Sequence, residues 1–238
     1  MHPFSIPPEL AARVEARCGT PHPFATLEAQ RTAFVVVDMQ NAYMDPAHGH
    51  AVCAMAPRIV PAVNRLAAAI RAAGGLVVWI QTAHDAADLE DWSVIYAMMN
   101  EAAGARRIQA LTRGSAGHAL WHELDIRPED EVVEKRRFSA FIQGSSELES
   151  RLRAHGVDTV LVGGTVTGVC CESTARDAMM RNFRAVMVSD ACAAQSDADH
   201  AAALCGFHSF FGDVLTVAEC ENGFARGAQQ QVAIFSGV

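Results

Sequence analysis

The sequence predicts an α/β fold of three layers, in which a central, mainly parallel six-stranded sheet is covered by helices on both faces. Six short apolar runs are typical of strands that are buried on both faces, and long helical segments separate most of them. Connections of that length allow neighbouring strands to run parallel. The predicted strands are 33–38, 76–81, 131–134, 159–162, 185–188 and 214–217, and the predicted helices are 8–17, 52–73, 146–155, 171–181 and 198–207.

Local patterns mark these elements in chain order. Prolines punctuate the N-terminal residues, and Pro8 opens a short helix. The first strand reads AFVVV and ends in a carboxylate, and the Ala-rich helix that follows is closed by Gly74 and Gly75. The run LVVWIQ forms the second strand, and a pair of valines marks the third. Gly156 ends the next helix, and the runs TVLV and AVMV form the fourth and fifth strands, before a last helix and a short sixth strand.

The composition favours one globular domain. Of the 238 residues, 50% are hydrophobic and 19% are charged, so a large core is available. No repeat or linker divides the chain, and we expect an N-terminal extension at 1–30 followed by one domain at 31–238. The net charge of −8, without a basic stripe, argues against a nucleic-acid partner. No apolar stretch is long enough for a transmembrane helix, which argues against a membrane protein.

The cysteines and the first residues indicate a cytoplasmic location. The N-terminal sequence lacks the basic and apolar regions of a secretory signal. The seven cysteines are scattered and include no CxxC pair, as expected of small buried side chains in a reducing compartment.

One cation differs from all the others. Of the 19 basic residues, Lys135 is the single lysine and the other 18 are arginines. Lysine is a compact point charge with an adjustable pKa, whereas arginine is a planar cation that stays protonated. Lys135 follows Val132 and Val133, at the point where a buried strand would end. This position indicates a functional role, and the alternative is a surface lysine retained by chance.

Polar residues that follow the strands are the site candidates, because ligands of such sheets bind beyond the carboxyl ends of the strands. Cys170 precedes a predicted helix, whose dipole favours a thiolate and whose free amides can hold an oxyanion. Asp38 can accept a proton and Lys135 can favour the thiolate, so the three together suit a nucleophilic cysteine site. Each alone would be read as a cap or a packing residue. The strand-end candidates are Asp38, Gln40, Asn41, Gln81, Thr82, His84, Lys135, Arg137, residues 165–170 and Asp190.

Neither a cofactor nor a metal is expected. No dinucleotide-binding or P-loop motif follows any predicted strand, which argues against a nucleotide site. Asp45, His48 and His50 have a spacing that a metal could use, but Pro46 and Gly49 mark a loop there and no second ligand set follows.

Three blocks of the sequence resemble the signature blocks of the isochorismatase-like cysteine hydrolase superfamily. They are TAFVVVDMQNAYMD at 32–45, EKRRFSAF at 134–141 and GGTVTGVCCESTARDA at 163–178. The resemblance extends over about 31–225 and implies a Rossmann-like, three-layer α/β/α fold.

The resemblance also assigns roles to residues of these blocks. It implies that Asp38 is the general base, Lys135 the cation and Cys170 the nucleophile. It further implies a non-proline cis peptide bond at 165–166 and an oxyanion hole formed by the amides of Val166 and Cys170.

Departures from the family pattern favour amide hydrolysis without a metal. Isochorismatases, which cleave a vinyl ether, usually lack the nucleophilic cysteine that is present here as Cys170. Nicotinamidases usually carry a DxHP metal motif after the second strand, and the residues from Gln81 to Asp85 do not match it. The VVVDMQNAY, SAF and FFGDV segments resemble ureidoacrylate-type and related N-carbamoyl amidohydrolases. Phe138 stands where such enzymes often have a tyrosine.

We therefore expect a cysteine-dependent amidohydrolase that cleaves a C–N bond of a small linear amide or ureido (N-carbamoyl) compound. It would release ammonia through a covalent intermediate on the cysteine and would act as a homo-oligomer, either a dimer or a tetramer. The alternatives are a nicotinamidase- or maleamate-type amidase, an isochorismatase-type ether hydrolase and a non-catalytic binding protein. The predicted substrate-binding residues are Asn41, Gln81, Arg137, Phe138 and His208.

Overall fold

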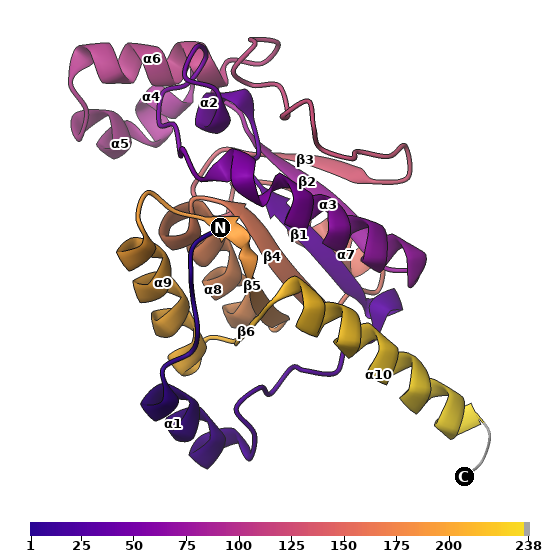
Figure 1. Cartoon of the computed structure of the whole chain (residues 1–238). Helices are drawn as coiled ribbons and strands as arrows, with labels where there is room; N and C mark the ends of the chain where they lie inside the picture. Colours follow the sequence, from indigo (N-terminus) through magenta and orange to yellow (C-terminus); the bar gives the residue numbers. More distant parts are fainter. Residues whose placement is uncertain (236–238) are drawn as a thin grey trace.

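The structure, a computed structural model that describes residues 1–235, has one sheet of six strands within that range (Figure 1). The strands lie in the order β3-β2-β1-β4-β5-β6, and all neighbouring pairs are parallel. The predicted α/β fold is confirmed, and the sheet is wholly rather than mainly parallel. The strands are β1 (Thr32–Val37), β2 (Leu76–Thr82), β3 (Glu131–Lys135), β4 (Thr159–Thr165), β5 (Arg184–Ala193) and β6 (Asp213–Leu215).

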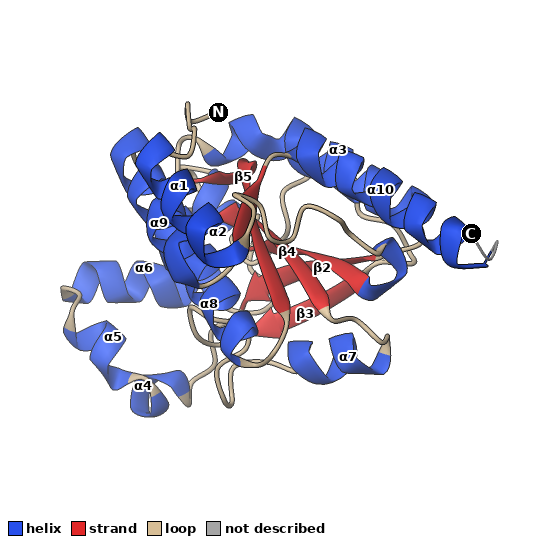
Figure 2. Ribbon diagram, turned by 90° about the horizontal axis from the view of Figure 1, so that it is seen from below, coloured by secondary structure: helices blue, strands red, loops and turns tan. Residues whose placement is uncertain are grey.

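Helices cover both faces of the sheet, which gives the three layers (Figure 2). Alternate side chains of β1 serve the two faces, because Phe34 and Val36 join one core while Val35 and Val37 join the other. All four are fully buried, and each contributes about 1.5–3 kcal/mol through removal from water. The first core is covered by α3 (Ala56–Ala72) and α10 (Val217–Phe235), and the second by α7 (Leu148–Ala154), α8 (Glu172–Met180) and α9 (Asp197–Phe210).

The strand order reverses between β1 and β4. The chain adds β2 and then β3 on one side of β1, and later adds β4, β5 and β6 on the other side. The carboxyl ends of β1 and β4 therefore meet at a topological switch point, where ligands of open α/β sheets bind. Val37 pairs with Gly164, so Asp38 and the residues that follow β4 reach the same edge of the sheet.

Four short helices lie beyond this edge, at the end of the molecule opposite α1 (Figure 1). They are α2 (Asn41–Met44), α4 (Asp88–Asp91), α5 (Ser93–Ala97) and α6 (Glu101–Leu111). Ala110 and Leu111 of α6 pack against Ala42 and Tyr43 of α2 in a small cluster of their own. The sequence pattern predicts none of these four helices. Helices of four or five residues, such as α2, α4 and α5, are too short to show a helical period, and Gly104 interrupts the pattern of α6.

The C-terminal boundary differs from the prediction. The last strand ends at Leu215 rather than at 217, and Val217 instead begins α10. Thr216 Oγ1 accepts a hydrogen bond from the Glu219 N–H at 3.2 Å, and Glu219 Oε2 accepts one from the Thr216 N–H at 2.7 Å. This reciprocal capping box starts a helix within a run that reads as a strand.

The N-terminal segment is attached to the domain along its length. α1 (Pro8–Cys18) contacts α9 and buries Leu10 and Val14, and the short turn η1 (Ala29–Arg31) leads into β1. His2 is also buried, and its Nε2 accepts a hydrogen bond from the Ala194 N–H at 3.0 Å. Within residues 1–235, no helix is long and apolar enough to span a membrane.

Candidate active site

Three side chains predicted from the sequence meet where β1, β3 and β4 end. Asp38 follows β1, Lys135 is the last residue of β3, and Cys170 lies in η2 (Thr167–Cys171), a wide helical turn between β4 and α8. Asp38 has a φ of 54°, in the left-handed region, and donates its N–H to the Ile80 carbonyl at 3.0 Å. Its Oδ2 lies 2.8 Å from Lys135 Nζ, and its carboxylate lies near enough to the Cys170 thiol to raise the pKa of that thiol.

Lys135 has a partner for each of its three donors. Its Nζ lies 2.8 Å from Asp38 Oδ2, 2.7 Å from Thr82 Oγ1 and 2.9 Å from the Arg137 carbonyl oxygen. The side chain is fully buried, and burial opposes the charged form, but the negative charge of Asp38 raises the pKa of Lys135 above its ordinary value. The residue is therefore an ammonium at neutral pH, in a compact site that suits lysine rather than arginine.

The Cys170 thiol is protonated in the free protein. Burial, together with the charge of Asp38 and the hydrogen bond to it, raises the pKa of Cys170 to about 12 against the opposing charges of Lys135 and Arg107. This differs from the thiolate that the helix dipole and the lysine suggest from the sequence. The reason is that Cys170 is only 5% exposed and that Asp38 already balances the lysine charge. A base must remove the proton during attack, and Asp38 is placed to do so.

The neighbouring Cys171 has a different environment. It is fully buried, and its Sγ lies 3.7 Å from the Gly163 carbonyl oxygen, its acceptor. Burial and the proximity of Cys192 raise the pKa of Cys171 well above its ordinary value. The side chain therefore packs beneath the turn, while Cys170 contacts Asp38.

A glycine permits the close approach of β4 to β1 beside the site. Gly164 has a φ of 111°, and a Cβ at this position would lie 2.1 Å from the Val37 carbonyl oxygen. Any side chain here would push the two strands apart at the level of Asp38. The peptide bond between Thr165 and Val166, just after this glycine, is cis, at the position that the family resemblance implies.

Two of the predicted substrate-binding residues hold a loop at the edge of the site. Asn41 Nδ2 donates to the Ala116 carbonyl at 2.8 Å, and Gln81 Nε2 donates to the His118 carbonyl at 2.9 Å. Gln40 Nε2 also donates to the His118 carbonyl, at 2.8 Å. The structure thus gives both predicted side chains a positioning role, and direct contact with a substrate stays a prediction.

The next two predicted residues, Arg137 and Phe138, surround Trp92. The Phe138 ring lies 5.0 Å from the Trp92 ring, edge to face, and the Arg137 guanidinium lies 5.1 Å from its centre. Arg137 Nη1 also lies 3.2 Å from Oδ1 of the buried Asp88. The charge of Arg137 is therefore balanced within the protein.

The fifth predicted residue, His208, is not brought to the other site residues. It lies in the last turns of α9, and its Nδ1 is 3.5 Å from Oδ1 of Asp213, the first residue of β6. The first residue of a strand in this sheet lies at its amino edge, whereas Cys170 follows the carboxyl end of β4. His208 is also fully buried, so the structure gives it a place in the core between α9 and β6.

The loop with the possible metal spacing does not form a ligand cluster. His48 Nε2 is 3.9 Å from Asp45 Oδ2, whereas the His50 ring lies against Tyr43 at 5.1 Å. Burial lowers the pKa of His50 to about 4, so its imidazole is neutral. No group of three or more His, Cys, Asp or Glu side chains suited to a metal occurs in the described part of the chain. Metal independence stays a prediction.

The structure gives Thr82, one of the strand-end candidates, a definite place in the catalytic cluster. Thr82 Oγ1 donates to Asp38 Oδ1 at 2.9 Å and accepts from Lys135, so it bridges the ion pair. Its signal in the sequence is its position at the end of β2, where it pairs in register with Lys135. The charge of Arg107 on α6 opposes the rise in the pKa of Cys170, and no sequence pattern indicates this.

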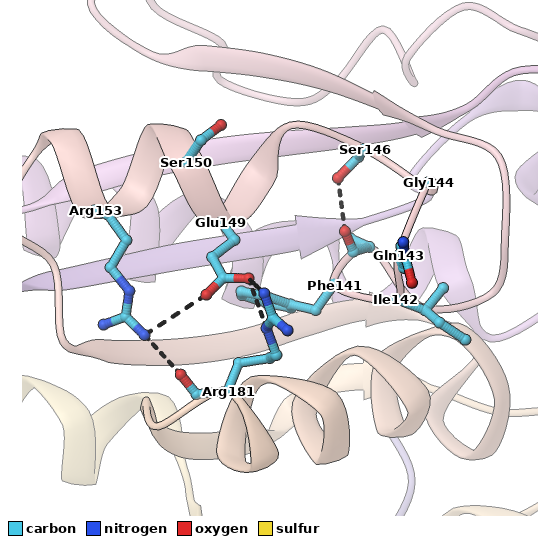
Figure 3. A pocket seen from close by; sticks show the side chains of 10 residues that line it. Phe141, Ile142, Gln143, Gly144, Ser146, Glu149, Ser150, Arg153 and Arg181 are labelled. Carbon is cyan, nitrogen blue, oxygen red and sulfur yellow. Dashed lines mark hydrogen bonds and ion pairs between the residues drawn. The ribbon is translucent and has the colours of Figure 1, made fainter.

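A large surface cavity lies elsewhere on the molecule. It has a volume of about 730 Å³ and lies between α7, the loop before it and the end of α8, with Phe141, Ile142 and Arg181 in its wall (Figure 3). Its charged groups pair with one another, because Glu149 lies 2.7 Å from Arg181 and 3.8 Å from Arg153. None of the three predicted catalytic residues lines it.

Known proteins share both this fold and these sequence blocks. The family model described as the isochorismatase domain matches residues 32–219. The chain belongs to the isochorismatase family. The chain is similar to the ureidoacrylate amidohydrolase RutB of Methylobacterium radiotolerans, with 36% identity over 216 residues, covering 85% of this chain and 82% of the relative. The RutB protein of Stutzerimonas stutzeri is 34% identical over 232 residues, with 90% of each chain covered.

Solved structures agree with this assignment to the isochorismatase family. A cysteine hydrolase from Pseudomonas syringae pv. phaseolicola has a TM-score of 0.75 and 30% identity, and the match covers 84% of this chain and 95% of that one. The N-carbamoylsarcosine amidase from Thermoplasma acidophilum has a TM-score of 0.62 and 28% identity, with 79% and 96% covered. These relatives are hydrolases, and the chain is an enzyme of the same class.

Proposed function

We propose that the chain is a cysteine-dependent amidohydrolase that cleaves a C–N bond of a small linear ureido or amide compound. The observation that carries this proposal is the buried cluster in which Asp38 contacts both the Lys135 ammonium and the Cys170 thiol. The cluster lies at the switch point of the sheet, where ligands bind. Packing alone does not require a buried ion pair beside a thiol, because burying two charges is costly. The names of the relatives support the same class of reaction.

The first half of the reaction transfers the acyl group to the enzyme. Asp38 accepts the thiol proton while Cys170 Sγ attacks the substrate carbonyl carbon, and the amides of Val166 and Cys170 hold the resulting oxyanion. The C–N bond then breaks, and the proton passes from Asp38 to the leaving nitrogen. Lys135 stabilises the negative charge throughout. A ureido substrate releases ammonia and leaves a thiocarbamate on the cysteine, whereas an amide leaves a thioester.

The second half regenerates the free enzyme. Asp38 accepts a proton from water while the hydroxide attacks the carbonyl carbon of the intermediate, and the C–S bond breaks. The thiol recovers its proton from Asp38. With a ureido substrate the released carbamate decays to carbon dioxide and an amine.

Ammonia release across a panel of ureides and amides tests the proposal. The wild-type protein should release ammonia from at least one linear ureide, and Cys170→Ala should abolish this. Cys171→Ala is the matched control, because the adjacent thiol faces the core, and it should retain activity. Mass spectrometry of a rapidly quenched reaction should find the acyl group on the peptide that contains Cys170. Turnover by Cys170→Ala at the wild-type rate would contradict the covalent mechanism.

We further propose that the enzyme is cytoplasmic and forms a dimer or tetramer. The free thiols of all seven cysteines support a reducing compartment. Light scattering coupled to size-exclusion chromatography tests the assembly, and a mass of one chain would contradict it.

A further inference from the structure

A histidine of α9 contacts the turn that contains Cys170. His200 Nδ1 lies 3.0 Å from the hydroxyl oxygen of Thr167, the first residue of η2. Both side chains are fully buried, and α9 packs against η2. The packing is close along the turn, since a Cβ at Gly168 would lie 3.4 Å from the Cβ of Ala203. The hydrogen bond therefore joins the helix to the turn within a tightly packed interface.

The imidazole of His200 is neutral and directs its hydrogen bonding at Thr167. Burial lowers the pKa of His200 to about 4, so at neutral pH one ring nitrogen carries a proton and the other is an acceptor. A hydroxyl both donates and accepts, so the contact with Thr167 is a hydrogen bond in either tautomer. The second ring nitrogen, Nε2, is buried without a hydrogen-bond partner in the described part of the chain. Burying a polar ring that makes a single hydrogen bond is unfavourable, so packing alone does not account for a histidine here.

Two residues of the N-terminal segment hold the His200 ring in place. The ring of His2 stacks on it, with centroids 4.6 Å apart and planes 24° apart, and the Phe4 ring lies at 5.9 Å, edge to face. His2 is fixed in turn, because its Nδ1 lies 2.6 Å from Asp197 Oδ1 and its Nε2 accepts the Ala194 N–H at 3.0 Å. Asp197 begins α9, and Ala194 directly follows β5. The direction of His200 Nδ1 is therefore set by residues far from the turn in the sequence.

Thr167 lies between the two amides of the proposed oxyanion hole. It follows Val166 directly and precedes Cys170 by three residues. The turn closes on Val166, because the Val169 N–H donates to the Val166 carbonyl at 3.0 Å and the Cys171 N–H donates to the same oxygen at 3.3 Å. A shift at Thr167 moves the two amides relative to each other. Oxyanion donors are effective only at about 2.7–3.1 Å from the developing charge, so such a shift weakens them.

We propose that His200 is a positioning residue for the reaction at Cys170. Through the Thr167 hydroxyl it fixes the start of η2, so that the amides of Val166 and Cys170 converge on the oxyanion, and His2 fixes the ring that does so. The inference rests on the proposed function, since it concerns the same cysteine. It adds the N-terminal segment to the parts of the chain on which the activity depends. A merely structural bond would affect the stability of the protein and not the chemistry of the thiol.

Two reagents that react with the same thiol separate these roles. p-Nitrophenyl acetate acylates a cysteine through a tetrahedral oxyanion: the S–C bond forms, the ester C–O bond breaks, nitrophenolate leaves, and Asp38 takes the thiol proton. Iodoacetamide alkylates the same sulfur by displacing iodide from a saturated carbon, where no oxyanion develops. An oxyanion hole accelerates only the first reaction. The ratio of the two rates at Cys170, each followed by mass spectrometry of its peptide, therefore reports the geometry of the turn.

Two substitutions remove the hydrogen bond from opposite ends. His200→Leu should slow the acylation of Cys170 about tenfold, as expected for one hydrogen bond, and leave its alkylation unchanged within about twofold. His200→Asn should recover most of the acylation rate, because its amide group can take the place of Nδ1, although the smaller side chain lowers the stability. Thr167→Val should match His200→Leu, and Thr167→Ser should recover the rate. The two losses should not add in the double variant of Thr167→Val and His200→Leu, since both remove the same bond.

Phe207→Leu is the matched control, because Phe207 is buried two turns further along α9. It should lower the thermal midpoint and leave the ratio of the two rates at the wild-type value. Equal slowing of both reactions in His200→Leu and Thr167→Val, or an unchanged ratio, would overturn the inference and leave the bond a structural role. Failure of the ester to acylate Cys170 in the wild-type protein would overturn it as well. Neither reagent is a ureide, so these results stand whether or not any ureide releases ammonia, and failure of the proposed function is detected separately.

Discussion

Replacing Thr82 by valine removes one oxygen atom from the centre of the catalytic cluster and leaves its shape unchanged. Thr82 is 3% exposed, and its hydroxyl is bonded to Asp38 at 2.9 Å and to Lys135 at 2.7 Å. Valine fills the same volume without either bond. The direct contact of 2.8 Å between Asp38 and Lys135 remains.

The expected loss follows from these two contacts. A hydrogen bond to a charged group contributes about 1.5–3 kcal/mol, and two of them contribute about 3–6 kcal/mol. The lower limit applies, because the ion pair itself is retained, so we expect a loss of about 3 kcal/mol in the free energy of unfolding. For a chain of this length, this corresponds to a fall of about 6–12 °C in the thermal midpoint.

Thr82→Ser is the matched control, because it keeps the hydroxyl and removes one methyl group, at a cost of about 1 kcal/mol. Urea unfolding gives the free energies of both variants, and ammonia release gives kcat. Thr82→Val should also lower kcat, since the carboxylate is held less firmly against the thiol, whereas Thr82→Ser should not. Equal stability of the two variants would refute the bridging role of the hydroxyl.

Three other predictions concern Cys170, Lys135 and the need for a metal ion. Because burial and Asp38 raise the pKa of Cys170 to about 12, its alkylation by iodoacetamide should accelerate about tenfold per pH unit from pH 7 to pH 10, as the thiolate fraction grows; a plateau below pH 8 would show that the thiol is acidic. Lys135→Arg should lower kcat by about 10²–10³-fold, because a planar guanidinium cannot reproduce the three contacts of the ammonium, and wild-type turnover would assign the lysine no catalytic role. Prolonged dialysis against EDTA should leave ammonia release unchanged, and activity that is lost and then restored by zinc, manganese or iron would direct attention to His48, His50 and His84.

The sequence predicts the parts of this protein that depend on continuous patterns. β1 and β2 are apolar runs that end within one residue of their predicted boundaries, whereas β4 continues past its predicted end at 162 to Thr165. Asp38 follows β1 directly, and Cys170 lies in the turn η2 that follows β4, so the site follows from the order of the strands. The chemistry of Lys135 is visible because the other basic residues are arginines.

The remaining features depend on tertiary contacts that no local pattern encodes. Asn41 and Gln81 are the right residue types for a pocket, but their donors are taken up by carbonyls of a distant loop. His208 lies near the end of α9, which returns the chain to the opposite edge of the sheet. The protonation state of Cys170 depends on how completely the fold buries it, which only the assembled structure can show.

Because β1 lies between β2 and β4, the sheet stays incomplete during much of the synthesis of the chain. β1 begins at residue 32, but its second neighbour, β4, begins only at residue 159. A growing chain that has completed β3 therefore holds a half-sheet whose open edge is a fully buried strand of the mature protein. Such edges pair readily with other chains, and parallel sheets form slowly. Fragments that stop before β4 should accordingly aggregate. In the folded protein β4 covers this edge of β1, and β4 also leads into the turn that contains Cys170.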